Sequence, residues 1–248
     1  MTYRTIVFNT RNHIAGITLD RPQAGNAVNP EMAQELQEVC RIINGDNDIY
    51  VVTLTGSGSA FCTGKDAQET MQYDAAASAA VAAIDRPVIA ALNGDALGEG
   101  LEIALAADIR IAAATARFGL PQITGGAIPS EGGTQRLPRI IGKGKALELL
   151  MTADIIGAGE ALEIGLVSRL TPPETLAAET QKLAETIAAK GPLALRYLKE
   201  AINKGMDMTL EQGLRMEADL YFLLHTTADR TEGISAFREK RNPEYKGK

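Results

Sequence analysis

Apolar positions along the chain fall into short runs that alternate with segments of helical spacing. Runs of apolar, often β-branched residues predict strands at Thr5–Asn9, Ile14–Leu19, Tyr50–Thr55, Pro87–Leu92, Asp108–Ala112 and Leu166–Leu170. Between them, helices are expected at Pro30–Asn44 (with Asn29 as N-cap), Ala75–Ala83, Gly98–Ala107, Ala146–Met151 and Ala158–Ile164. Gly56–Gly64 is expected to be a loop of small residues. The first two strands are expected to form a hairpin, and the alternation favours a buried, mostly parallel sheet covered by helices.

Beyond Pro172 the pattern becomes entirely helical. Four helices are predicted there, at Thr175–Lys190, Pro192–Gly205, Thr209–Thr226 and Thr227–Arg241. We therefore expect an α/β core over residues 1–195 and a C-terminal helical region over residues 196–248.

Composition and charge narrow the class of protein. The chain has 248 residues, 45% of them hydrophobic, and a formal net charge of −6. An acidic balance without an internal basic block argues against nucleic-acid binding. The longest apolar stretch, near Ile103–Ala107, is too short to cross a bilayer, and the first residues lack a secretory pattern. Cys40 and Cys62 lack metal-ligand spacing, and His13 and His225 are isolated, so no metal is expected. These features predict a cytoplasmic enzyme or a soluble binding protein.

The segment around Gly98–Glu102 carries candidate chemistry. A strand ends, a glycine-containing turn follows, and a helix is predicted to begin near Glu99. The first amides of a helix have no internal acceptor and lie at its positive end, where they stabilise an anion or a developing oxyanion. Glu102 stands one turn later and can flank whatever docks there. The alternative is a glycine-rich turn with an ordinary first-turn glutamate.

Several motifs in order resemble the enoyl-CoA hydratase/isomerase, or crotonase, family over nearly the whole chain. The matching segments are LDRP and GNA within Leu19–Ala27, AFCTGKD at Ala60–Asp66, RPVIAALNGDALGEGLEIALAADIRIAA at Arg86–Ala113, FGLP and IPSEGGTQRLPRIIGKGKA within Phe118–Ala146, and SAFREKR at Ser235–Arg241. The resemblance implies a spiral of β–β–α units followed by a helical trimerisation region.

The resemblance also implies a chemistry and its residues. A thioester carbonyl would be held by the backbone N–H groups of Lys65 and Glu99, and Glu102 would be the catalytic acid/base. Such donors stabilise an enolate oxygen without reorganising, and one donor is typically worth about 3 kcal/mol of the barrier. Coenzyme A would belong to the substrate, with no separate cofactor.

The sequence departs from the family at two positions near this chemistry. Family hydratases have a second glutamate where this chain has Gln122, and an amide cannot exchange a proton near pH 7. Glu99 stands where the family usually has glycine, and a carboxylate facing the pocket would repel an enolate. We expect its side chain to turn away or to be neutral. Some family isomerases use an acid at the position that Ser130 occupies here, one residue before Glu131. We expect Glu131 itself to be a solvated loop carboxylate.

By the same resemblance, the coenzyme A contacts are expected at Ala24, Ala60, Thr63, Lys65 and Asp66, and on a neighbouring subunit's C-terminal helices at Tyr221, Phe237 and Lys240. Without the resemblance, the two aromatic residues would be taken as helical core. A basic cluster in this acidic protein suits a phosphate-rich ligand and comprises Arg238, Lys240, Arg241, Lys246 and Lys248. We expect a homotrimer, or a hexamer of two trimers.

The favoured function is hydration of a 2-enoyl-CoA or conjugated dienoyl-CoA. Glu102 activates water and the two N–H groups hold the enolate. The missing second glutamate leaves two alternatives open. The first is another enolate chemistry, such as isomerisation, decarboxylation or thioester hydrolysis, and the second is a catalytically silent acyl-CoA-binding subunit. Acyl specificity is expected to depend on the segment 67–83, whose alanine-rich sequence resembles nothing specific.

Overall fold

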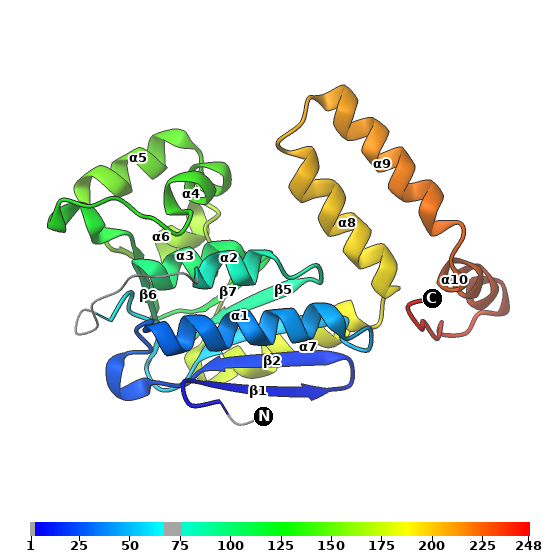
Figure 1. Ribbon diagram of the computed structural model, residues 1–248, viewed down its shortest axis with the longest axis horizontal. Helices are drawn as coiled ribbons and strands as arrows, with labels where there is room; N and C mark the ends of the chain where they lie inside the picture. The colour runs from blue at the N-terminus through cyan, green and yellow to red at the C-terminus, as the bar shows by residue number, and fades with distance from the viewer. Residues whose placement is uncertain (1–2, 67–75) are drawn as a thin grey trace.

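The computed structural model describes residues 3–66 and 76–248, and its centre consists of two sheets (Figure 1). The larger sheet has six strands in the spatial order β1 (Ile6–Arg11), β2 (Ile14–Leu19), β3 (Val51–Gly56), β5 (Val88–Leu92), β7 (Ile109–Ala113) and β10 (Arg169–Thr171). The smaller sheet has four short strands in the order β4 (Ala60–Cys62), β6 (Asp95–Leu97), β8 (Arg117–Gly119) and β9 (Ile156–Gly157).

The strands follow one another in a repeating order. Each of β3, β5 and β7 in the larger sheet is followed directly by a short strand of the smaller one, β4, β6 and β8. The predicted hairpin is present, with β1 antiparallel to β2, while β2, β3, β5, β7 and β10 are all parallel. After β4 and β6, the helices α2 (Ala77–Ala82) and α3 (Glu99–Ala106) return the chain to the larger sheet, which gives the expected β–β–α repeat.

Helices cover both faces of the larger sheet. The helices of the α/β region that precedes the C-terminal arm are α1 (Pro30–Gly45), α2 (Ala77–Ala82), α3 (Glu99–Ala106), α4 (Gly133–Ile141), α5 (Lys143–Thr152), α6 (Ala158–Glu163) and α7 (Leu176–Ala188). α7 packs against one face, where Leu176 and Ala184 join a buried cluster with Val51, Ile89 and Ile111. The other face belongs to the main core, which includes the buried residues of α1 and α3.

The start of α1 is the one that its sequence predicts. The Asn29 side chain accepts a hydrogen bond from the Met32 amide at 2.9 Å, and Pro30 occupies the first helical position. Met32, Leu36 and Ile43 are fully buried, as their helical spacing requires.

The short strands and one helix differ from the sequence prediction. β4 lies inside the segment expected to be a loop, and the last strand begins at Arg169 instead of Leu166. The amides of Leu166 and Val167 bond the carbonyl of Ala161, so these buried residues close the end of α6. β6, β8, β9 and α4 were not predicted, because elements of two or three residues show no periodicity and glycines open α4.

The last three helices form an arm that projects from the core (Figure 1). They are α8 (Pro192–Gly205), α9 (Leu210–Leu224) and α10 (Ala228–Glu239). Residue 195 therefore lies in the first turn of α8. No helix within the described residues is long and apolar enough to cross a membrane.

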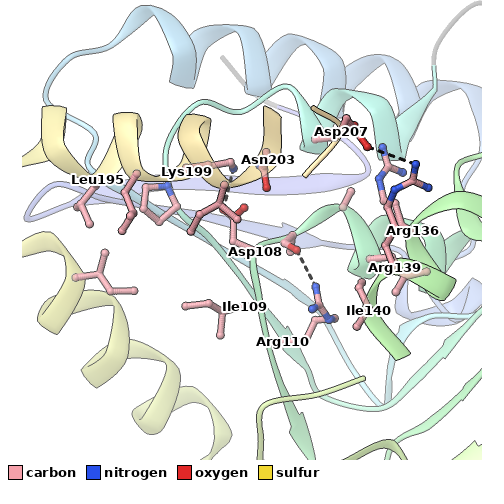
Figure 2. Close-up of a pocket in the computed structure, with 18 residues that line it drawn as sticks. Asp108, Ile109, Arg110, Arg136, Arg139, Ile140, Leu195, Lys199, Asn203 and Asp207 are labelled. Carbon is pink, nitrogen blue, oxygen red and sulfur yellow. Dashed lines mark hydrogen bonds and ion pairs between the residues drawn. The ribbon is translucent and has the colours of Figure 1, made fainter. Parts of the chain in front are cut away.

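Ion pairs attach α8 to the core. Lys199 Nζ lies 2.8 Å from Asp108 Oδ2, and Arg196 pairs with Asp85. A cavity of about 670 Å³ lies between α8 and the core, lined also by Arg136 and Arg139 of α4. Figure 2 shows Lys199 beside Asp108 at this cavity. None of Lys65, Glu99, Glu102 and Gln122 lines it, so the cavity is separate from the chemistry predicted above.

Candidate active site

Two glycines bring the predicted donor amides together. Gly64 (φ 114°) precedes Lys65, and Gly98 (φ 51°) precedes Glu99, so each amide follows a residue whose backbone conformation favours glycine. A Cβ on Gly64 would lie 3.3 Å from the Leu97 carbonyl oxygen and 3.9 Å from the Glu99 nitrogen. The turn after β4 therefore touches the turn that begins α3.

Gly100 allows the first turn of α3 to pack on β4. A Cβ at this position would lie only 2.1 Å from the carbonyl oxygen of Cys62. The first amides of α3 lack intrahelical acceptors, and the helix dipole makes this end positive. The sequence GEG therefore places an anion-stabilising helix terminus directly against the end of a strand.

Glu102 is almost fully buried, with 1% of its surface exposed. Its Oε1 accepts hydrogen bonds from the backbone amides of Glu131 at 2.7 Å and Gly133 at 2.8 Å. Gly133 is the first residue of α4, so the carboxylate also lies at the N-terminus of a second helix. Both bonds reach one oxygen, which leaves Oε2 directed elsewhere.

Opposing effects set the pKa of Glu102. Burial raises its pKa above the usual range for glutamate, while the amides of Gly133 and Glu131 and the charge of Arg136 lower it. Burial is the larger effect, so the net direction is upward. The result is a carboxylate that is a stronger base than an exposed glutamate, held in a fixed orientation.

Gln122 lies beside Glu102. It belongs to a 3₁₀ turn, Pro121–Gly125, and its Nε2 donates to Glu102 Oε2 at 3.3 Å. Its Oε1 is buried and has no hydrogen-bond partner among the described residues. Gln122 therefore orients the second oxygen of Glu102 and presents an acceptor to whatever enters the site.

The Glu99 side chain is also buried, with 7% of its surface exposed. Burial raises its pKa to about 7, helped by the charges of Glu131 and Glu102 and opposed by that of Lys65. This shift favours the protonated form far more than in an exposed glutamate, which is the direction of the expected neutral side chain. The Cys62 thiol nearby stays protonated, because burial raises its pKa to about 12.

Glu131 enters the site through its backbone. Its amide holds Glu102, while its carboxylate accepts hydrogen bonds from the Ser78 hydroxyl at 2.9 Å and the Ser78 amide at 3.3 Å. Ser78 lies in the first turn of α2, so the carboxylate caps that helix. Arg136 donates to the Glu131 carbonyl at 2.8 Å. The expectation that Glu131 is a solvated loop carboxylate is therefore wrong.

The two segments predicted to bind coenzyme A lie side by side. The Thr63 amide donates to the Gly25 carbonyl at 3.0 Å, and the Val28 amide donates to the Gly64 carbonyl at 2.8 Å. Ala24, Thr63 and Lys65 are partly or fully exposed along this junction. Ala60 is buried, so its side chain does not form an open surface.

A polar network behind this junction holds it in place. Arg21 forms an ion pair with Asp66 at 2.8 Å, so the Asp66 carboxylate already has a partner within the chain. Asn26 accepts from the Arg21 amide and donates to the carbonyls of Ser57 and Ala60. Sequence reasoning singled out the GNA motif but did not predict this bracing role, because the burial of Asn26 is seen only in the folded chain.

Tyr221 lies on α9, Phe237 on α10 and Lys240 at the C-cap of α10, across the molecule from the start of α3 (Figure 1). Tyr221 and Phe237 are 54% and 85% exposed, so neither is a core residue of this chain. The structure does not bring them to Glu102 of the same chain. No group of three or more His, Cys, Asp or Glu residues suited to a metal ion occurs in residues 3–66 and 76–248.

Comparison with known proteins decides the family. The sequence profile of the enoyl-CoA hydratase/isomerase family matches residues 9–248. The chain belongs to that family. It is 40% identical to the crotonyl-CoA hydratase of Syntrophomonas wolfei, covering 99% of both chains. It is also 40% identical to the (E)-benzylidenesuccinyl-CoA hydratase of Thauera aromatica, covering 98% of this chain and 99% of the relative.

A solved structure confirms the fold. The crystal structure of enoyl-CoA hydratase from Bacillus anthracis superposes with a TM-score of 0.95, at 41% identity, over 99% of this chain and 100% of that one. The expected crotonase-type α/β fold is therefore confirmed. The family is that of the enoyl-CoA hydratases and isomerases, so an acyl-CoA thioester fits as the substrate of this chain.

Proposed function

We propose that this enoyl-CoA hydratase/isomerase family member adds water across the double bond of a 2-enoyl-CoA thioester. Glu102 removes a proton from water, whose oxygen bonds the β-carbon. The π electrons move toward the thioester oxygen, where the amides of Lys65 and Glu99 stabilise the enolate. Protonation of the α-carbon then gives a 3-hydroxyacyl-CoA.

The arrangement of Glu102 is the observation that carries this proposal. A buried carboxylate with a raised pKa lies three residues into the helix whose first amide is a proposed oxyanion donor. One oxygen is fixed by two amides, and the other contacts Gln122. Such a group is suited to activate a bound water beside the thioester.

The relatives support hydration over the alternative chemistries. Proteins named as hydratases for crotonyl-CoA and for (E)-benzylidenesuccinyl-CoA are equally similar to this chain. The acyl groups in these two names differ greatly in shape. The names therefore support hydration as the reaction of this chain, but they do not indicate which acyl group it accepts. Of the predicted specificity segment, residues 67–75 lie outside the described residues, and Ala77–Ala82 form α2.

The direct test follows absorbance of the conjugated thioester, with crotonyl-CoA and an aryl-substituted enoyl-CoA as substrates. We expect loss of absorbance and a product heavier by one water. Isomerisation leaves the mass unchanged, and thioester hydrolysis releases free coenzyme A. A 2-carboxyacyl-CoA as a third substrate would lose carbon dioxide if the reaction were a decarboxylation. Tight acyl-CoA binding without any product would instead identify a silent binding subunit.

The proposed phosphate contact gives a prediction on Lys240. It is exposed at the C-cap of α10, where a neighbouring subunit's coenzyme A would meet it. We expect Lys240→Ala to raise KM about tenfold with kcat nearly unchanged, because a remote phosphate contact contributes mainly uniform binding. Lys182→Ala, which removes an exposed lysine of α7, is the control and should leave both constants unchanged. A large fall in kcat at constant KM would contradict the assignment.

We further propose that the chain assembles as a trimer or as two trimers. The arm carries an unusually exposed apolar surface, formed by Leu198, Ile202, Met206, Leu210, Leu214, Tyr221, Phe222 and Phe237. Exposed surfaces of this kind mark protein interfaces. Light scattering at micromolar concentration should give three or six times the 26.4 kDa of one chain. A monomeric mass would refute the assembly.

A further inference from the structure

Hydration needs a second proton transfer that Gln122 cannot perform. Glu102 takes a proton from water, but the α-carbon must also receive one. An amide does not exchange protons near neutral pH, and the Gln122 Nε2 donates to Glu102. If the proposed hydration is correct, on which this inference rests, the site needs a proton donor to the α-carbon other than Gln122.

Three carboxyl groups influence one another electrostatically in the site, and two already have fixed partners. Glu102 is held by the amides of Glu131 and Gly133, and the Glu131 carboxylate is bound to Ser78. The Glu99 carboxyl group accepts no hydrogen bond from residues 3–66 or 76–248, although 93% of the residue's surface is covered. Glu99 is therefore the buried acid that the local structure leaves available.

Glu99 carries both the proposed amide donor and a carboxyl group, so that carboxyl starts from the residue that would hold the thioester oxygen. Its amide is a proposed donor to the thioester oxygen, at about 2.9 Å in an ordinary hydrogen bond. The substrate's α-carbon is two bonds from that oxygen, and the Glu99 side chain leaves the same residue. We infer that the side-chain carboxyl of Glu99 delivers the proton to the α-carbon, in place of the second glutamate that Gln122 replaces.

The charges around Glu99 suit this role. Burial, Glu131 and Glu102 raise its pKa to about 7 against the opposing charge of Lys65, and the nearby Cys62 thiol is neutral. The protonated form is the donor, so its fraction falls as the pH rises through about 7. A protonated Glu99 also removes the repulsion that a carboxylate would exert on the enolate.

The proton balance closes over one turnover. Water loses a proton to Glu102 while its oxygen bonds the β-carbon, and the enolate forms. The enolate collapses as the α-carbon takes the proton from Glu99, which becomes a carboxylate. The proton held by Glu102 then passes to Glu99 through solvent, so the net reaction consumes one water and restores both groups.

The test measures deuterium incorporation at the α-carbon of butyryl-CoA in D₂O, a saturated thioester that cannot be hydrated. Wild type should exchange, and Glu99→Gln should exchange at least about 10²-fold more slowly. Adding Gln122→Glu to that variant should restore at least tenfold, since it returns a carboxyl to the family position. Glu163→Gln, which neutralises an exposed glutamate at the end of α6, is the matched control and should exchange like wild type. In hydration assays, the alkaline limb near pH 7 should disappear with Glu99→Gln.

Distinct results separate this inference from the proposed function. Exchange that depends on Glu99 in an enzyme that does not hydrate enoyl-CoA would refute hydration and keep Glu99 as the proton carrier. Hydration with Glu99→Gln exchanging within threefold of wild type would overturn the role of Glu99 alone. Loss that Gln122→Glu fails to restore would also overturn it. Circular dichroism checks folding, and Glu99→Gly provides a second variant that keeps the amide.

Discussion

Replacing Glu102 with glutamine is expected to lower kcat for hydration by about 10²–10⁴-fold, the usual contribution of a general acid–base group. Glutamine keeps the length and the acceptor oxygen that the amides of Glu131 and Gly133 require. It cannot take a proton from water. Acyl-CoA binding should persist, because the proposed oxyanion donors are backbone groups and do not change.

The surroundings of Glu102 make this variant a clean test. The amide nitrogen of the new glutamine at position 102 would face Gln122. The Gln122 Oε1 is buried and has no partner among the described residues, so rotation of the Gln122 amide group supplies an acceptor for that nitrogen. The substitution therefore exchanges one hydrogen-bonded pair for another. Binding is measured by calorimetry with a saturated acyl-CoA, and turnover by absorbance. Near-normal turnover would remove Glu102 from the mechanism and make Glu99 the next candidate base.

Glu131→Gln provides the control for that experiment. It also neutralises a carboxylate near the site, but its side chain contacts Ser78 and its amide remains. We expect its kcat to change less than tenfold. A fall as large as that of Glu102→Gln would show that charge near the pocket, and not proton exchange at Glu102, controls the rate.

Most of the fold was accessible from sequence because its long elements have clear periodicity. The hairpin, α1 with its Asn29 cap, and the four C-terminal helices are present close to the predicted bounds. The three-residue strands of the smaller sheet were not accessible. Their residues form strands through pairing with segments distant in sequence, as β4 pairs with β6 although all of β5 lies between them in the chain.

Part of the candidate site could also be predicted from the sequence, and part of it could not. Glu102 was singled out from a motif, since its proposed role depends on its own side chain. The amides of Glu131 and Gly133 that hold it were not, because any residue supplies an N–H and only the folded loop directs it. The role of the Glu131 carboxylate was missed for a similar reason. Its partner Ser78 is 53 residues away, and no local pattern connects the two.

Gly100→Ala is expected to damage both stability and catalysis. The added methyl group would lie 2.1 Å from the Cys62 carbonyl oxygen and 2.7 Å from the Cys62 carbonyl carbon, contacts that no side chain tolerates. The start of α3 must therefore move away from β4. Overpacking of this kind typically costs about 1–3 kcal/mol, which lowers Tm by roughly 2–12 °C in a chain of this size.

The same movement should separate the two proposed oxyanion donors. Lys65 follows β4 and Glu99 begins α3, so a shift of one element against the other misplaces one amide, typically worth about 10²–10³-fold in kcat. Gly144→Ala is the control, since Gly144 also lies in the first turn of a helix but a Cβ there meets nothing within 4 Å. Alanine should stabilise that helix by about 0.5–1 kcal/mol. Equal thermal and kinetic behaviour of the two variants would mean that close packing of α3 on β4 does not set the geometry of the donors.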